Sequence, residues 1–174
     1  MTLGFYDNFP PNAHHTESYL AMVSSRQLQQ RLIQFFGGLN RQKFSFEEVT
    51  IPTVPGGVVI FEFGLAETDG FTFLNDAQAK KALDYVSKEQ AHILDFFCAI
   101  RYYKDNCGKL QALKFDYYML RMMFGKGTFE LQVYHERGPR YLSPQDLAEF
   151  LANSLSGGSN RKILKKSAST GKHI

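Results

Sequence analysis

A short glycine-rich segment, Phe124-Gly125-Lys126-Gly127-Thr128, sets the strongest limit on how this chain folds. Two glycines around one polar residue, between apolar runs, predict a tight β-hairpin. We assign Gly125 and Lys126 to the centre of a type II′ turn, which requires φ > 0 at Gly125. The turn places Phe124 opposite Gly127, Met122 opposite Phe129, Leu120 opposite Leu131 and Tyr118 opposite Val133. One face of the hairpin is then apolar, so we expect an antiparallel sheet with one buried face.

Capping signals and apolar spacing predict helices near residues 25–37, 76–87 and 144–156. In the first, Ser24-x-x-Gln27 has the form of a capping box, and the apolar residues that follow recur every three or four positions. Ser143 followed by Pro144 specifies the start of the last helix. We therefore expect three helices packed on the sheet.

Runs rich in β-branched and aromatic residues predict strands at 44–51, 58–65, 71–74 and 110–124. Residues 87–103 fit two descriptions, because their apolar residues also recur at helical spacing. We favour a strand from about 94 to 104, since aromatic density is high and Asp105-Asn106-Cys107-Gly108 is typical of a turn.

These elements predict an α+β fold with a mainly antiparallel sheet of about five strands. The chain has 174 residues, of which 44% are hydrophobic, enough for one core. We expect a single domain over residues 1–156, in which residues 1–16 form an extended arm because Pro10 and Pro11 oppose a helix. Residues 157–174 are expected to form a flexible tail.

Charge is concentrated in this tail. Its five basic residues, Arg161, Lys162, Lys165, Lys166 and Lys172, exceed the formal net charge of +3, so the rest of the chain is slightly acidic. A globally basic nucleic-acid-binding domain is therefore not indicated. Nucleic acid is a weakly supported partner, through the tail.

Cysteine and histidine spacing does not predict a metal site or a cofactor. Cys98 and Cys107 match no zinc or redox motif, and we expect Cys98 to be buried. His14 and His15 point in opposite directions in an extended arm, so they cannot chelate one ion together. With no secretory h-region near the N-terminus and no long apolar run, we expect a soluble, cytoplasmic protein without a membrane span.

The densest polar cluster lies between the hairpin and the last helix. It contains His135, Arg137, Arg140 and Tyr141, and with Arg101 it forms a candidate ligand site. Guanidinium groups near a helix N-terminus suit a phosphate or a carboxylate. The alternative is that the arginines pair with local carboxylates and anchor the turn before the helix.

A possible acid/base pair follows from the hairpin register, which places His135 opposite Asp116. A carboxylate beside an imidazole can orient it for proton transfer. No Ser, Cys or Thr nucleophile is placed beside the pair, so a structural role is the stronger alternative.

Two segments alternate basic and aromatic residues, Arg101-Tyr102-Tyr103-Lys104 and Lys114-Phe115-Asp116-Tyr117-Tyr118. Such strands can stack nucleic-acid bases, although ordinary sheet packing also explains them. We therefore expect a non-catalytic binding or interaction protein whose partner is a protein or an anionic ligand. The alternative is a small enzyme acting on an anionic ligand. A deep pocket containing His135, Arg137, Arg140 and Arg101 would favour the enzyme, and a flat apolar patch would favour binding.

Overall fold

The computed structural model of the chain describes residues 3–67, 69–157 and 163–167. Within these residues, nine strands form one antiparallel sheet in the order β2-β3-β5-β7-β8-β1-β9, with β4 paired to β3 and β6 paired to β5. The strands are β1 His15–Ala21, β2 Lys43–Ser45, β3 Gly57–Glu67, β4 Gly70–Phe73, β5 Ile93–Asn106, β6 Lys109–Ala112, β7 Asp116–Gly125, β8 Thr128–Arg137 and β9 Leu164–Lys166. The helices are α1 Ser25–Leu39, α2 Phe46–Val49, α3 Asp76–Lys88 and α4 Pro144–Gly157.

The predicted fold class is confirmed, since the structure is α+β with a mostly antiparallel sheet. The sheet has more strands than the five expected, and α2 is an additional helix. The three predicted helices are α1, α3 and α4. The Ser24 hydroxyl accepts the Gln27 N–H at 3.1 Å, and the Gln27 side chain accepts the Ser24 N–H in return, which completes the predicted capping box.

Residues 44–51 were expected to form a strand, and this prediction is wrong for most of the segment. After the short β2, the chain turns into α2 at Ser45. The Glu48 carboxylate accepts the Ser45 N–H at 2.7 Å, so this pair caps a helix within a segment whose composition favours a strand. Local capping here outweighs β propensity.

The predicted type II′ turn is also wrong. Gly125 pairs with Thr128, so Lys126 and Gly127 are the central residues, and Gly127 rather than Gly125 has a positive φ, of 71°. In the observed register the Phe124 and Phe129 rings pack with their centroids 5.4 Å apart. The predicted register placed Phe124 opposite Gly127, which has no side chain to pack against. Because the shift is two residues, each side chain keeps its predicted face.

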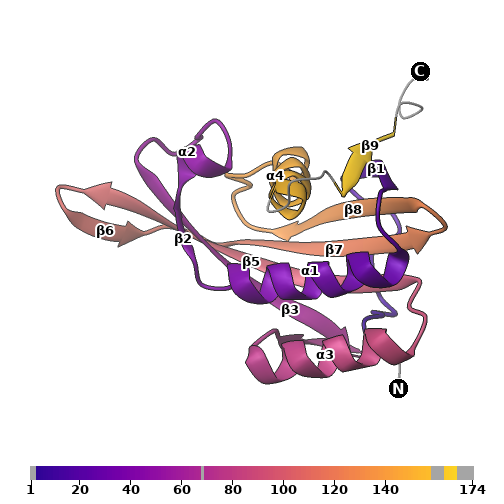
Figure 1. Cartoon of the computed structure of the whole chain (residues 1–174). Coiled ribbons are helices and arrows are strands. Elements are labelled where there is room, and N and C mark those ends of the chain that lie inside the picture. Colours follow the sequence, from indigo (N-terminus) through magenta and orange to yellow (C-terminus); the bar gives the residue numbers. More distant parts are fainter. Residues whose placement is uncertain (1–2, 68, 158–162, 168–174) are drawn as a thin grey trace.

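The strand favoured from about 94 to 104 is confirmed and forms most of β5, while the start of the segment 87–103 belongs to the end of α3 and the loop after it. The expected strand at 110–124 is divided. Its first part forms β6, which pairs back onto β5 as a fully exposed hairpin, and its second part forms β7. Figure 1 shows the β6 hairpin projecting away from the body of the protein.

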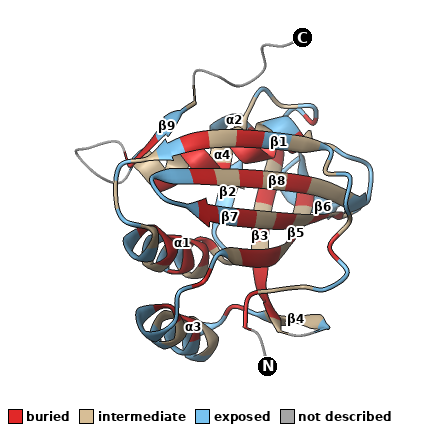
Figure 2. Ribbon diagram, turned by 90° about the vertical axis from the view of Figure 1, so that its right-hand side faces the viewer, coloured by how far each residue is buried: buried red, intermediate tan, exposed pale blue. Residues whose placement is uncertain are grey.

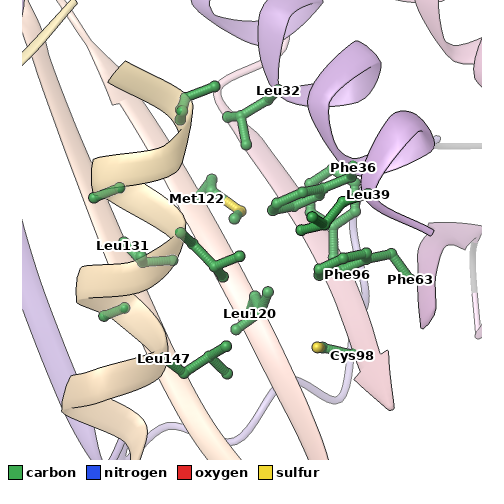
Figure 3. Close-up of a cluster of buried hydrophobic side chains, with 14 of the residues drawn as sticks. Leu32, Phe36, Leu39, Phe63, Phe96, Cys98, Leu120, Met122, Leu131 and Leu147 are labelled. Carbon is green, nitrogen blue, oxygen red and sulfur yellow. The ribbon is translucent and has the colours of Figure 1, made fainter. Parts of the chain in front are cut away.

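All four helices lie on one side of the sheet, with α1 and α4 directly against the strands (Figure 1). Phe36 of α1 stacks on Phe63 at 4.2 Å and meets Phe96 edge-on at 4.8 Å. Figure 3 shows these rings in one buried cluster with Leu120, Met122 and, from α4, Leu147. Buried and partly exposed residues alternate along β7 and β8, which Figure 2 makes visible. We call the other side, which carries no helix, the helix-free face.

The N-terminal segment lies against the helix-free face. Gly4 bonds to both β3 and β5, through Ala66 and Asp95. The Arg121 guanidinium forms a two-pronged ion pair with the buried Asp95 carboxylate, both contacts being 2.8 Å, and packs over the Phe9 ring at 4.5 Å. The chain then enters β1, a strand that the sequence did not predict.

Part of the segment predicted as a flexible tail belongs to the sheet. β9 pairs with β1, and the Ile163 side chain beside it is buried. Lys166 pairs with Glu17 at 3.4 Å. Lys165 is exposed on β9, and the remaining basic residues Arg161, Lys162 and Lys172 lie outside the described residues. Among the described helices, none has the length and apolar character needed to cross a membrane.

Candidate functional site

The centre of the predicted site is the Asp116 carboxylate, which is completely buried. It accepts four hydrogen bonds, from His135 Nε2 at 2.8 Å, the Tyr102 hydroxyl at 2.7 Å, and the backbone N–H groups of Arg140 and Tyr141 at 2.6 and 2.9 Å. Each oxygen therefore has two donors. The anion that the loop before α4 binds is the protein's own carboxylate.

The loop is shaped to reach Asp116. Gly138 has φ 119° and Arg140 has φ 62°, both in the left-handed region. A Cβ atom on Gly138 would lie 2.8 Å from the Asp116 Cα atom, so only glycine fits there. The left-handed conformations of these two residues direct the successive N–H groups of Arg140 and Tyr141 at the Asp116 carboxylate, as in other anion-binding loops.

His135 lies at the edge of this network, with 9% of its side chain exposed. Its backbone N–H donates to His14 Nδ1 at 2.9 Å, and the His14 ring stacks on Tyr134 at 4.6 Å. Burial, followed by the charges of Arg140 and His135, lowers the pKa of His14. A neutral His14 ring is needed to accept the His135 N–H, so the hydrogen bond and the pKa direction agree.

Two buried phenols surround the carboxylate. Burial raises the pKa of Tyr102 far above its usual range, and it does the same for Tyr118. The Tyr118 hydroxyl donates to the Leu142 carbonyl, and Tyr102 packs edge-on against Tyr141 at 5.0 Å. Both phenols therefore stay protonated near neutral pH, and Tyr102 donates to the Asp116 carboxylate while Tyr118 donates to the loop before α4.

The structure separates the six predicted site residues into two groups. Asp116, His135 and the backbones of Arg140 and Tyr141 form the buried network just described. Arg101 and Arg137 lie on the helix-free face. Arg101 pairs with Glu62 at 3.2 Å and lies over the Phe115 ring at 5.3 Å, while Arg137 lies over the Tyr117 ring at 5.0 Å.

The two arginines border a row of aromatic side chains. Phe71 packs 5.5 Å from Phe97, Phe97 packs 5.7 Å from Tyr117, and Tyr117 packs 6.0 Å from Phe115. All four side chains are partly exposed. We call this set the aromatic platform; it consists of Phe71, Phe97, Phe115, Tyr117, Arg101 and Arg137.

Sequence reasoning found only part of this platform. The alternation of basic and aromatic residues pointed to Arg101, Phe115 and Tyr117. It missed Phe71 and Phe97, which come from other segments and reach the row only through strand pairing. The signal that could have found Phe97 is its period-two spacing from Arg101 along one strand.

Four clefts of the described part of the chain lie away from the predicted site residues. A cleft of about 540 Å³ lies on the helix side and is lined by Phe35, Phe44 and Phe150. Three others border β1 and β8, α2 and α4, and α3. None of these four clefts is lined by a predicted site residue or by the aromatic platform.

No group of three or more His, Cys, Asp or Glu side chains within the described ranges is arranged to hold a metal ion. The chain matches no protein-family model, and neither a curated protein nor a solved structure matches it.

Proposed function

We propose that this is a non-catalytic binding protein whose binding surface is the aromatic platform on the helix-free face. The observation that carries the proposal is the contrast between the two groups of predicted residues. The platform arginines and rings are at least partly exposed, and none of the four clefts described above includes them. Contiguous, partly exposed aromatic rings of this kind are typical of binding surfaces.

The buried network around Asp116 also supports a non-catalytic function. A catalytic carboxylate must orient a base whose other nitrogen reaches a substrate. Asp116 is shared among four donors, two of which, the N–H groups of Arg140 and Tyr141, belong to the loop before α4. This favours a structural role for Asp116, which was the alternative considered from the sequence.

A small enzyme acting on an anionic ligand is the second candidate. It is favoured by the 2.8 Å contact between Asp116 and His135, and by the absence of a hydrogen bond to His135 Nδ1 among the described residues. Arg140 lies next to this pair, and its side chain is exposed. In that account His135 exchanges the proton and Arg140 holds the anion.

Cytoplasmic localisation belongs to the same proposal. Cys98 and Cys107 are both free thiols. A reducing compartment keeps such thiols unpaired.

Methionine methyl groups provide the test. Met119 lies on the helix-free face, between Phe97 on β5 and Tyr134 on β8, whereas Met122 lies in the core. The protein labelled with ¹³C-methyl methionine is titrated with a panel of aromatic fragments, nucleotides and short peptides. A platform ligand should shift the Met119 signal and leave Met122 unchanged.

A matched pair of variants separates the two functions. Tyr117→Ala should remove ligand-dependent shifts at Met119, and His135→Gln should preserve them. Turnover of any panel compound that His135→Gln abolishes, with the fold retained, would support the enzyme instead. A panel in which no compound moves Met119 would overturn the proposed surface.

A further inference from the structure

We propose that the aromatic platform binds single-stranded nucleic acid. This inference rests on the proposed function and adds the chemical class of the ligand. Each part of the platform corresponds to one part of a nucleotide. Planar rings stack with bases, and guanidinium groups bind phosphates or stack on bases in turn.

The rings form a continuous row across the sheet. Phe71 is on β4, Phe97 on β5 and Tyr117 on β7, and Phe115 directly precedes β7. Successive ring centroids are 5.5, 5.7 and 6.0 Å apart. A row that crosses strands can contact several consecutive bases, whereas a single ring contacts one.

Two positively charged side chains lie over the row of rings. Arg101 and Arg137 lie over two of its rings, with their guanidinium carbons 5.3 and 5.0 Å from the ring centroids. The nearby carboxylate of Glu62 is held by Arg101 at 3.2 Å and by Arg41 at 3.8 Å. Two arginines therefore meet one carboxylate, and Arg137 forms no ion pair among the described residues. The row is complementary to an anionic chain.

The shape of the site favours a single strand over the other ligands with this chemistry. A free nucleotide is best held in a cleft, and none of the four clefts includes the platform. In a duplex the base faces are stacked on one another, so side-chain rings cannot reach them. On a flat row of rings each stacked base contributes a weak contact. A single strand binds more tightly than one nucleotide because it repeats that contact along its length.

Binding is measured by fluorescence anisotropy with the full chain at low salt. The probes are fluorescein-labelled oligothymidine and oligouridine of about 12 nucleotides, within the usual size of single-strand sites. A duplex of the same length is the comparison. We expect both single strands to bind more tightly than the duplex. A difference in Kd between oligouridine and oligothymidine then shows whether the platform prefers RNA or DNA.

Platform variants should weaken this binding. Tyr117→Ala and Phe97→Ala should each raise the Kd roughly 5- to 100-fold, the usual effect of losing one stacked base. Arg137→Gln should lower the slope of log Kd against log salt by about one, because it removes one phosphate contact. Phe35→Ala and Arg31→Gln, both on α1, are the matched controls and should leave the Kd unchanged, with melting curves showing that every variant folds.

Several results would overturn the inference. These are a duplex bound as tightly as a single strand, single-strand binding that survives Tyr117→Ala and Phe97→Ala, and binding lost only in Lys165→Gln. The failure of the inference is distinguishable from failure of the proposed function. If oligonucleotides do not bind but another compound shifts Met119, the ligand class is wrong and the binding surface stands.

Discussion

Oδ1 of Asp116 lies 2.8 Å from Nε2 of His135, although the two residues are not opposite each other in the sheet. His135 pairs with Tyr118, and an irregularity in pairing follows at Tyr117. Both side chains point to the helix side, where a diagonal neighbour two residues away is still within reach of a long side chain. The contact expected from the wrong register is therefore present for a different geometric reason.

Replacing Asp116 by Asn should destabilise the protein by roughly 2–5 kcal/mol, the range for disrupting a buried charged network. The amide keeps only one acceptor oxygen, and its NH₂ group would face N–H donors of the loop. Urea denaturation measures the change. Glu136→Gln, at an exposed position nearby, is the control and should stay within about 0.5 kcal/mol. An Asp116→Asn protein as stable as the wild type would show that the loop does not depend on the carboxylate.

Two glycines should respond in opposite directions to alanine. Gly138→Ala should cost about 1–3 kcal/mol or more, because φ is 119° and the added Cβ would collide with Asp116. Gly38→Ala, in α1 with open space around it, should stabilise the protein by roughly 0.5–1 kcal/mol. Thermal melts of both variants check the sign. Equal effects would be inconsistent with the loop geometry.

The pH dependence of stability should contain a contribution from His14. Its pKa is lowered in the folded state, so the unfolded chain binds more protons as the pH falls below about 6.5. The stabilisation is complete above that pH and is lost as the pH falls through the folded-state pKa. We expect the melting temperature of the wild type, relative to that of His14→Gln, to be higher at pH 8 than at pH 5. An identical difference at both values would contradict the lowered pKa.

The two cysteines should differ in reactivity. Burial, with a smaller contribution from Asp116, raises the pKa of the Cys98 thiol well above its usual range, whereas Cys107 is exposed on the β6 hairpin. A thiol reagent should therefore modify one cysteine in the folded protein and both after denaturation. In Cys107→Ser the fast reaction should disappear. Rapid modification of Cys98 would mean that β5 opens readily.

Local signals in the sequence were sufficient for the three longer helices, α1, α3 and α4, because caps such as Ser24 with Gln27 are set by neighbouring residues. They were not sufficient for β1. That strand carries the buried Glu17, which is stabilised by His15 at 3.0 Å and by Lys166 from the far end of the chain. A buried carboxylate breaks the alternation of apolar and polar residues that marks a strand. Its partners are known only once the fold is known.

The candidate site shows the same division. The predicted cluster of His135, Arg137, Arg140 and Tyr141 lies within seven consecutive positions. His135 and Arg137 would share a face in a regular strand, but the irregularity between the pairs Tyr118–His135 and Tyr117–Arg137 turns them to opposite sides. The cluster was expected as one site because its residues are close in sequence, and the irregular pairing divides it between the two sides of the sheet. The aromatic platform shows the opposite case, in which residues far apart in sequence are brought together. Phe71 and Phe97 approach Tyr117 only when β4, β5 and β7 are aligned.

Photo-crosslinking tests the central claim, single-strand binding on the helix-free face, most directly. A 4-thiouridine oligonucleotide is irradiated with the full chain, and modified tryptic peptides are identified by mass spectrometry. Trypsin releases Phe97 in a peptide of residues 89–101 and both Phe115 and Tyr117 in a peptide of residues 115–121. We predict cross-links in these two peptides. Cross-links confined to the basic residues after 157, or to the α1 peptide of residues 32–41, would contradict the account.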